Sequence, residues 1–175
     1  MTTPRYKAIE PIQYKDFIIG IEAMSEVSDE VCALGLDHFE EVEKLYREHP
    51  CEPDLGLYSR FEEAGLHVLF TVRSLKDGEM PLVGHLSYFL VHSVHMSGIL
   101  EAVEDFIYLT PEVRSKGISR ALFSFAESAL RKLKVSYIKM VSKEPLGAPK
   151  AGKFLEAEGF KLIGLQYCKA LHEEE

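Results

Sequence analysis

The sequence has no long apolar run, no recognisable leader and few cysteines. Its longest apolar stretch, Pro81 to Val94, is interrupted by polar residues that include His85, Ser87 and His92, and it falls short of the roughly 18 to 20 residues that cross a bilayer. The N-terminal residues, MTTPRYKAIEP, lack the apolar core of a signal peptide. Three cysteines have no spacing typical of metal ligands or a disulfide framework, namely Cys32, Cys51 and Cys168. These absences predict a cytoplasmic protein with no membrane-spanning helix.

The chain also lacks a surplus of basic residues. Its net charge is −8 and its isoelectric point is near 5.4, which disfavours binding to nucleic acid or to anionic lipid as a main role. The charge is uneven, however, since Glu22 to Glu63 contains 13 acids and 3 bases, whereas Pro111 to Lys153 contains 3 acids and 10 bases. This asymmetry is typical either of solvated faces or of separate surfaces for an anionic and a cationic ligand.

The length of 175 residues predicts one domain, residues 1–175, because no repeat or linker divides the chain. Periodicity and turn residues predict these elements in order: a strand at 6–12, a helix at 28–49 that begins at Ser28 and breaks near Gly35, a short helix at 57–64, strands at 67–74, 82–96 and 102–109, a helix at 118–133, a strand at 135–141, a helix at 150–158 and a strand pair within 160–171. The three central strands form an antiparallel meander, and the next strand follows a parallel crossover. The predicted fold class is α/β, an α+β sandwich with a mixed sheet of about six or seven strands flanked by about four helices.

The segment from Asp105 to Leu122 has the physical features of a phosphate site. A strand ends at Leu109, a turn follows, and RSKGIS opens the best-patterned helix of the chain. A helix start offers unpaired N–H groups and a partial positive charge, Gly117 permits close approach of the backbone, and Arg114 and Lys116 add full charges.

The run IYLTPEVRSKGISRAL resembles the acetyl-CoA-binding signature of the GNAT superfamily of N-acetyltransferases, and the predicted order of elements is similar to that family over most of the chain. The resemblance implies the twisted GNAT sheet and an enzyme that transfers acetyl from acetyl-CoA, without a metal, to a primary amine by direct attack in a ternary complex. It implies pantetheine binding by the backbone of Ile107, Tyr108 and Leu109. It also implies that Arg114 leads the pyrophosphate loop, whose residues are Ser115, Lys116, Gly117, Ile118, Ser119 and Arg120.

The sequence departs from the family pattern at three positions. Ser119 stands where Gly or Ala is usual, and Ala148 and Leu155 stand where many members have an Asn and a Tyr general acid. Neither Ala148 nor Leu155 can donate a proton, so the acid and base must be sought elsewhere.

Two acidic residues before the signature strand, Glu104 and Asp105, are the candidates for the general base. Strand alternation favours Asp105, which would share a face with Ile107 and Leu109 unless a bulge exchanges the two carboxylates.

Other side chains offer weaker candidates for proton transfer. Tyr167 or Tyr137 is the alternative acid, and His92 and His95 are either a proton relay to the carboxylates or structural residues. No metal site has convincing spacing, and no arrangement supports Cys168 as a nucleophile.

The acceptor is expected to be a small-molecule or protein amine, weakly favoured as cationic by the acidic N-terminal region, and a homodimer is a further expectation. An inactive GNAT-like module that binds acyl-CoA or a protein partner is the main alternative. A second alternative, a site for a different phosphate ligand, has less support, since the glycines of a dinucleotide fingerprint are missing.

Overall fold

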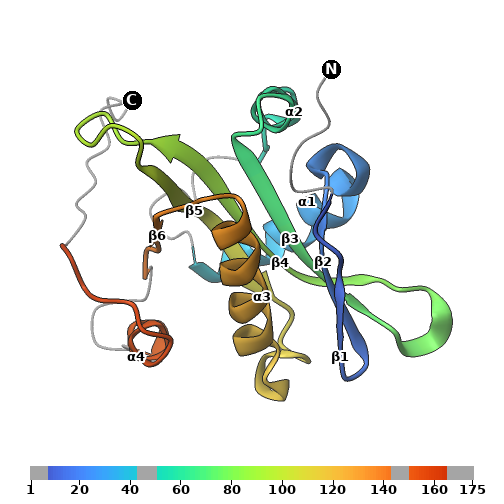
Figure 1. Cartoon of the computed structure of the whole chain (residues 1–175). Helices are drawn as coiled ribbons and strands as arrows, with labels where there is room; N and C mark the ends of the chain where they lie inside the picture. Colours follow the sequence, from blue (N-terminus) through green and yellow to red (C-terminus); the bar gives the residue numbers. More distant parts are fainter. Residues whose placement is uncertain (1–7, 43–50, 143–149, 165–175) are drawn as a thin grey trace, which may run out of the picture. The chain divides into compact units, whose positions relative to one another are not determined.

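The computed structural model describes residues 8–42, 51–142 and 150–164. The helices and strands of these residues, drawn in Figure 1, are β1 (Ile12–Tyr14), β2 (Phe17–Glu22), α1 (Met24–Val42), α2 (Leu55–Glu63), β3 (His67–Ser74), β4 (Leu82–His92), β5 (Leu100–Leu109), α3 (Ile118–Lys132), β6 (Tyr137–Lys139) and α4 (Lys150–Ala157). Contacts divide the chain into two units, Met1–Lys143 and Glu144–Glu175, so the single domain stays a prediction.

The first unit contains one six-stranded sheet in which each strand pairs with its neighbours in sequence, from β1 to β6. Strands β1 to β5 run antiparallel, and β6 is parallel to β5. The crossover between β5 and β6 contains α3, as a parallel connection requires. The predicted mixed α+β fold with its meander and parallel crossover is therefore confirmed.

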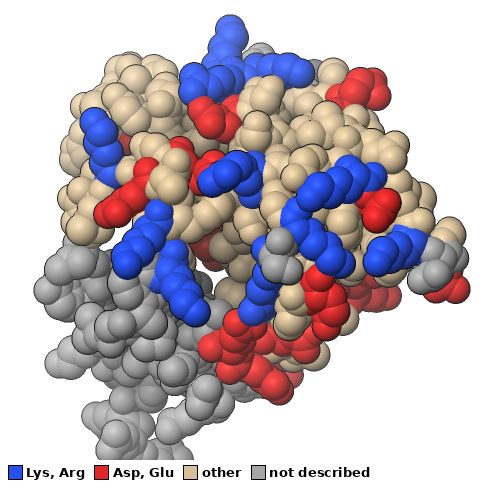
Figure 2. Space-filling view, turned by 90° about the horizontal axis from the view of Figure 1, so that it is seen from below, with Lys and Arg blue, Asp and Glu red and all other residues tan. Residues whose placement is uncertain are grey.

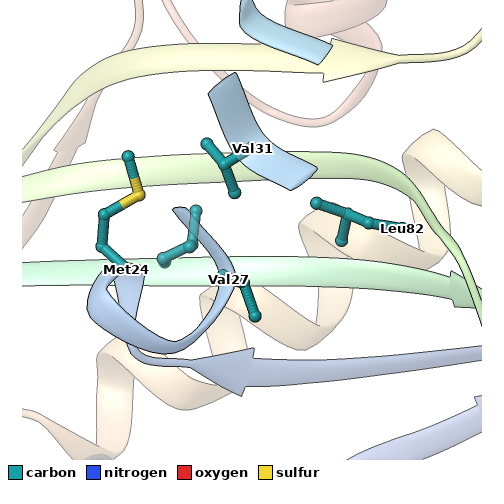
Figure 3. Close-up of a cluster of buried hydrophobic side chains, with 5 residues drawn as sticks. Met24, Val27, Val31 and Leu82 are labelled. Atoms are coloured by element: carbon teal, nitrogen blue, oxygen red, sulfur yellow. The ribbon is translucent and has the colours of Figure 1, made fainter. Parts of the chain in front are cut away.

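Apolar side chains cover both faces of this sheet. On β3, Phe70 meets the ring of Phe125 on α3 at 6.0 Å, whereas its neighbour Leu69 belongs to a buried cluster with α1. Figure 3 shows that cluster, in which Met24, Val27 and Val31 of α1 approach Leu82 of β4. Since consecutive residues of a strand point to opposite faces, α3 lies on one face and α1 on the other.

The N-terminal predictions need correction. Of the described part of the strand expected at 6–12, only Ile12 lies in a strand, and a hairpin of β1 and β2 follows instead. Pro11 has no N–H for a ladder, whereas Phe17 and Ile19 bury themselves fully against the sheet. Burial therefore decides where the edge strands form.

Helix α1 begins at Met24 rather than at Ser28, and it bends at Val27, whose φ is −128°, rather than at Gly35. Its start is capped from outside, because the carboxylate of Glu62 on α2 accepts bonds from the backbone N–H groups of Met24 and Ser25. A cap supplied by a distant residue leaves no local signal in the sequence.

Other boundaries differ less. Strand β4 stops at His92, because residues 93–99 form a turn closed by a bond from the N–H of Ser93 to the carbonyl of Ile99. In the second unit, α4 ends as predicted, with Gly159 following at a φ of +90°. Residues 160–164 are not in a strand, and the rest of the strand pair predicted within 160–171 lies outside the described residues.

Candidate functional site

Strand β5 has two different edges. On one side it pairs with β4 along its length, and on the other it pairs with β6 only from Glu101 to Val103. The register of β4 and β5 shifts by one residue between Ser87 and Tyr88, which makes Asp105 the extra residue of a bulge. No strand of the described ranges pairs with the second edge of β5 beyond Val103.

That second edge carries backbone donors and acceptors. The N–H of Thr110 donates to the carbonyl of Val83 at 3.0 Å, and antiparallel pairs alternate between bonded and non-bonded positions. The alternation directs the backbone groups of Tyr108 at β4 and those of Ile107 and Leu109 away from it. An extended ligand can bond to such an edge in the manner of an added strand.

The loop after β5 leads into α3. Arg114–Lys116 form a 3-10 turn, and Gly117 closes it at a φ of +79°, in the left-handed region. No side chain in the described ranges caps the first turn of α3, and this turn has no acidic residue. Its N–H groups thus keep their donor capacity and their partial positive charge. Of the other residues predicted for this loop, Ser115 lies within the 3-10 turn. At the start of α3, Ile118 is buried, Ser119 is half-buried and Arg120 is exposed.

The turn between β1 and β2 packs against this loop. Lys15 donates from Nζ to the carbonyl of Lys116 at 2.8 Å, across 101 positions of sequence. The hydroxyl oxygen of Tyr14 would lie 3.0 Å from a Cβ added to Gly117. The positive φ therefore favours glycine at this position, and a side chain there would also have to displace the hydroxyl of Tyr14. The sequence contains no local signal for this contact.

A pocket of about 240 Å³ lies along the second edge of β5, beyond Val103. Its lining combines two residues of α1 with five predicted cofactor-binding residues: His38, Glu41, Ile107, Tyr108, Leu109, Arg114 and Ser119. A second pocket, of about 540 Å³, shares two of these residues and is strongly acidic, with Asp37, Glu40, Glu41, Tyr108, Pro111 and Glu112 in its wall. Figure 2 shows basic side chains gathered on the face seen from below, with acidic side chains beside them.

The side chain of Asp105 lies on the face of the sheet that α1 and α2 cover. Its Oδ2 accepts a bond from the hydroxyl of Tyr58 at 2.7 Å and another from the hydroxyl of Ser87 at 3.0 Å. The expectation that Asp105 shares a face with Ile107 and Leu109 is wrong, because the bulge turns it toward Tyr58. The stated alternative holds instead: the bulge exchanges the two carboxylates, so that Glu104, opposite Tyr88, lies on the face of Ile107, opposite Leu86.

Tyr58 comes from α2 and is enclosed by aromatic rings, with centroid distances of 5.1 Å to His67, 5.9 Å to Phe89 and 6.5 Å to Phe106. Burial and the neighbouring carboxylate of Asp105 raise the pKa of its hydroxyl. The hydroxyl therefore stays protonated and donates to Asp105.

The other candidates for proton transfer lie elsewhere. Glu104 accepts a bond at 3.1 Å from the backbone N–H of Val141, which follows β6. His92 pairs with Leu100 at the far end of β4 and is exposed, so the relay to the carboxylates is wrong. Tyr137 is an exposed residue of β6, with 55% of its surface accessible, and Tyr167, Ala148 and Cys168 lie outside the described residues.

A fully buried histidine, His85, lies near Asp105 on the same face. Its ring meets that of Phe106 edge-on at 4.5 Å, and neither of its nitrogens has a hydrogen-bond partner in the described part of the chain. Burial, together with the nearby His38, lowers the pKa of His85 to about 3, so its imidazole is neutral.

Tyr58, Ser87 and His85 are site residues that the sequence alone did not predict. The pairing of β3 with β4 and the packing of α2 bring them together, and alternation along β4 was the one available hint, because it sets His85 and Ser87 on the same face.

No cluster of three or more metal-ligating side chains occurs among residues 8–42, 51–142 and 150–164. Within the same residues, no helix combines the length and the apolarity needed to span a membrane.

No model of a known protein family and no curated protein sequence matches the chain. Solved structures do match. A ribosomal-protein-alanine N-acetyltransferase from Brucella melitensis biovar Abortus 2308 is 18% identical with a TM-score of 0.64, and the match covers 89% of this chain and 99% of the other. An aminoglycoside acetyltransferase from an uncultured soil metagenomic sample is 16% identical with a TM-score of 0.68, covering 89% and 99%.

A third match is to the structure of AAC(6')-Iy in complex with the bisubstrate analogue CoA-S-monomethyl-acetylneamine. It is 13% identical with a TM-score of 0.60, and the match covers 88% of this chain and 98% of the other. The chain thus has the fold of the GNAT acetyltransferases.

Proposed function

We propose that the chain is an N-acetyltransferase that uses acetyl-CoA and acts on a primary amine. The observation that carries this proposal is the second half of β5, whose second edge pairs with no strand of the described residues and which a short loop joins to the basic start of α3. The similarity in fold to acetyltransferases, one of them bound to a CoA analogue, supports the same assignment.

The residues present fit acetyl-CoA. The outward backbone groups of Ile107 and the outward N–H of Leu109 match the amide groups of a pantetheine arm, and the N–H groups from Gly117 to Arg120 suit a pyrophosphate. Arg114 and Lys116 add positive charge at the same loop. The buried side chain of Ile118 leaves only its backbone for the ligand.

When bound, acetyl-CoA supplies an activated acetyl thioester. The amine must lose a proton to react, and the carboxylate of Asp105 is the proposed base because Asp105 lies in the stretch of β5 beyond Val103, where β5 no longer pairs with β6. The bonds from Tyr58 and Ser87 hold that carboxylate in one orientation. Glu104 is the second candidate, and its carboxylate accepts a bond from the backbone N–H of Val141. Tyr167 remains the proposed acid.

The acceptor is proposed to be a small molecule or protein that carries a cationic amine. The acidic pocket beside Tyr108 supports this class, because four carboxylates line it, from Asp37, Glu40, Glu41 and Glu112. Carboxylates attract an ammonium ion and lower its free energy near the site.

Calorimetric titration with acetyl-CoA tests the cofactor site. Gly117→Asp places a carboxylate where the pyrophosphate would bind, and we expect at least a tenfold loss of affinity, on the order of 1.4 kcal/mol. The control is Gly98→Asp, which has nearly the same φ, +81° against +79°, but lies in a turn with open space around it. An absence of binding to the unmodified chain and to Gly98→Asp would refute the proposal.

Release of free thiol from acetyl-CoA over a panel of amines then tests catalysis. We expect turnover with cationic amines and at least about a hundredfold loss in Asp105→Asn, the range typical of general-base catalysis. Binding of acetyl-CoA without turnover on any amine would instead favour the inactive acyl-CoA-binding module.

A further inference from the structure

Arg114 is fixed by three groups of the protein. Its Nε donates to the carbonyl of Leu109 at 2.7 Å, and its two Nη atoms donate to the two carboxylate oxygens of Glu41 at 2.7 and 2.6 Å. Its guanidinium carbon lies 5.2 Å from the centre of the Tyr108 ring. The residue that leads the phosphate loop is therefore already paired, through a bidentate contact, with a carboxylate of α1.

The same fork of donors suits a phosphate. A guanidinium binds carboxylate and phosphate with similar bidentate geometry, so an anionic ligand and Glu41 compete for Arg114. The pair is also exchangeable, because the side chains of Arg114 and Glu41 are 40% and 47% exposed and solvent screens such pairs.

Glu41 lies at the boundary between two pockets. It lines the pocket along β5 together with Arg114, and it lines the acidic pocket together with Asp37. A Glu41 carboxylate released from Arg114 adds an uncompensated negative charge to the acidic pocket. An anionic ligand that displaces Glu41 from Arg114 therefore strengthens the binding of a cation in the acidic pocket. By thermodynamic linkage, a cation bound in that pocket strengthens the binding of the anion at Arg114 to the same extent.

We propose that Glu41 is an exchangeable counter-ion of Arg114, which the phosphates of the bound cofactor displace, so that cofactor binding strengthens the site for a cationic acceptor. This inference rests on the proposed function. It makes Glu41 a residue that weakens cofactor binding and couples it to the acceptor.

Titration of the full chain with CoA tests the exchange. Glu41→Gln removes the competitor, and we expect the dissociation constant for CoA to fall about two- to fivefold, which corresponds to an exposed ion pair. Asp37→Asn is the matched control, since it removes one negative charge from the same helix and the same acidic pocket. We expect it to change the constant by less than about twofold, because it lies outside the contacts of Arg114.

Two further arms complete the experiment. Pantetheine has no phosphate, so Glu41→Gln should leave its affinity unchanged. In an Arg114→Leu background, Glu41→Gln should no longer tighten CoA binding, which a double-mutant cycle detects.

Weaker CoA binding in Glu41→Gln would overturn the inference and make the pair a structural tie. Equal tightening in Asp37→Asn would also overturn it, in favour of general electrostatics. A complete lack of CoA binding by the unmodified chain would refute the cofactor site itself, a distinct result from these two.

Discussion

Asp105 depends on a side chain of another element for its orientation. Tyr58 donates to it at 2.7 Å from α2, so Tyr58→Phe removes one of its two donors and keeps the aromatic packing with Phe89. A hydrogen bond to a charged group is worth about 1.5 to 3 kcal/mol, and we expect kcat to fall about tenfold or more, with the affinity for acetyl-CoA unchanged.

Thiol-release kinetics and calorimetry measure these two quantities. Tyr137→Phe is the control, because it makes the same change on an exposed residue of β6. An unchanged kcat in Tyr58→Phe would show that Asp105 does not act in the orientation that Tyr58 gives it.

At the scale of single residues, the sequence predicted the loop around Gly117 better than it predicted the residues for proton transfer. Gly117 and its basic neighbours form a contiguous run, so local chemistry identifies them. The bulge at Asp105 and the position of Tyr58 arise from pairing and packing between distant segments, and no pattern in a single sequence encodes them.

At the scale of elements, the turn between β1 and β2 supports the loop that leads into α3, through Lys15 and Tyr14. Gly117→Ala strains a backbone at a φ of +79° and sets a methyl group 3.0 Å from the hydroxyl oxygen of Tyr14. Strain at a positive φ costs about 1 to 2 kcal/mol, and the contact with Tyr14 must also be relieved. We expect lower stability and a displaced loop with weaker CoA binding.

Gly98→Ala provides the matched comparison, because its φ is +81° and no atom lies within 4 Å of an added Cβ. Urea unfolding of both variants separates the backbone strain, which they share, from the contact with Tyr14. Tyr14→Phe removes the crowding oxygen and should recover part of the difference. Equal losses of stability in the two glycine variants would show that the turn does not support the loop.

At the scale of the whole molecule, periodicity was sufficient for the fold class. The β-branched and aromatic residues of β3 reflect burial on both faces of the sheet, and the three- and four-residue spacings of α3 reflect burial against one face, so both elements were readable. The hairpin of β1 and β2 was missed, because edge strands as short as Ile12–Tyr14 carry too few residues for a pattern. The start of α1 was missed because Glu62 caps it from α2.

The stability of the molecule should fall on mild acidification because of His85. Burial lowers the pKa of His85 to about 3, against 6.5 for an exposed histidine. Between pH 3 and pH 6.5 the imidazole of His85 binds a proton in the unfolded chain but not in the folded chain, so the free energy of unfolding rises with pH. The contribution of His85 to stability is fully present above its unfolded pKa of 6.5 and is lost as the pH falls toward 3. From pH 7.5 to 5.5, His85 alone should remove about 1.3 kcal/mol.

Urea unfolding at the two pH values measures this loss, and His85→Leu should abolish that part of it. The carboxylates with lowered pKa values, Glu30, Glu41, Glu62 and Glu112, lose their contributions only as the pH falls below about 4.5, so this window isolates histidine. The same substitution at the exposed His92 is the control. If His85→Leu and the unmodified chain lose equal stability, the imidazole of His85 takes up its proton within the folded molecule.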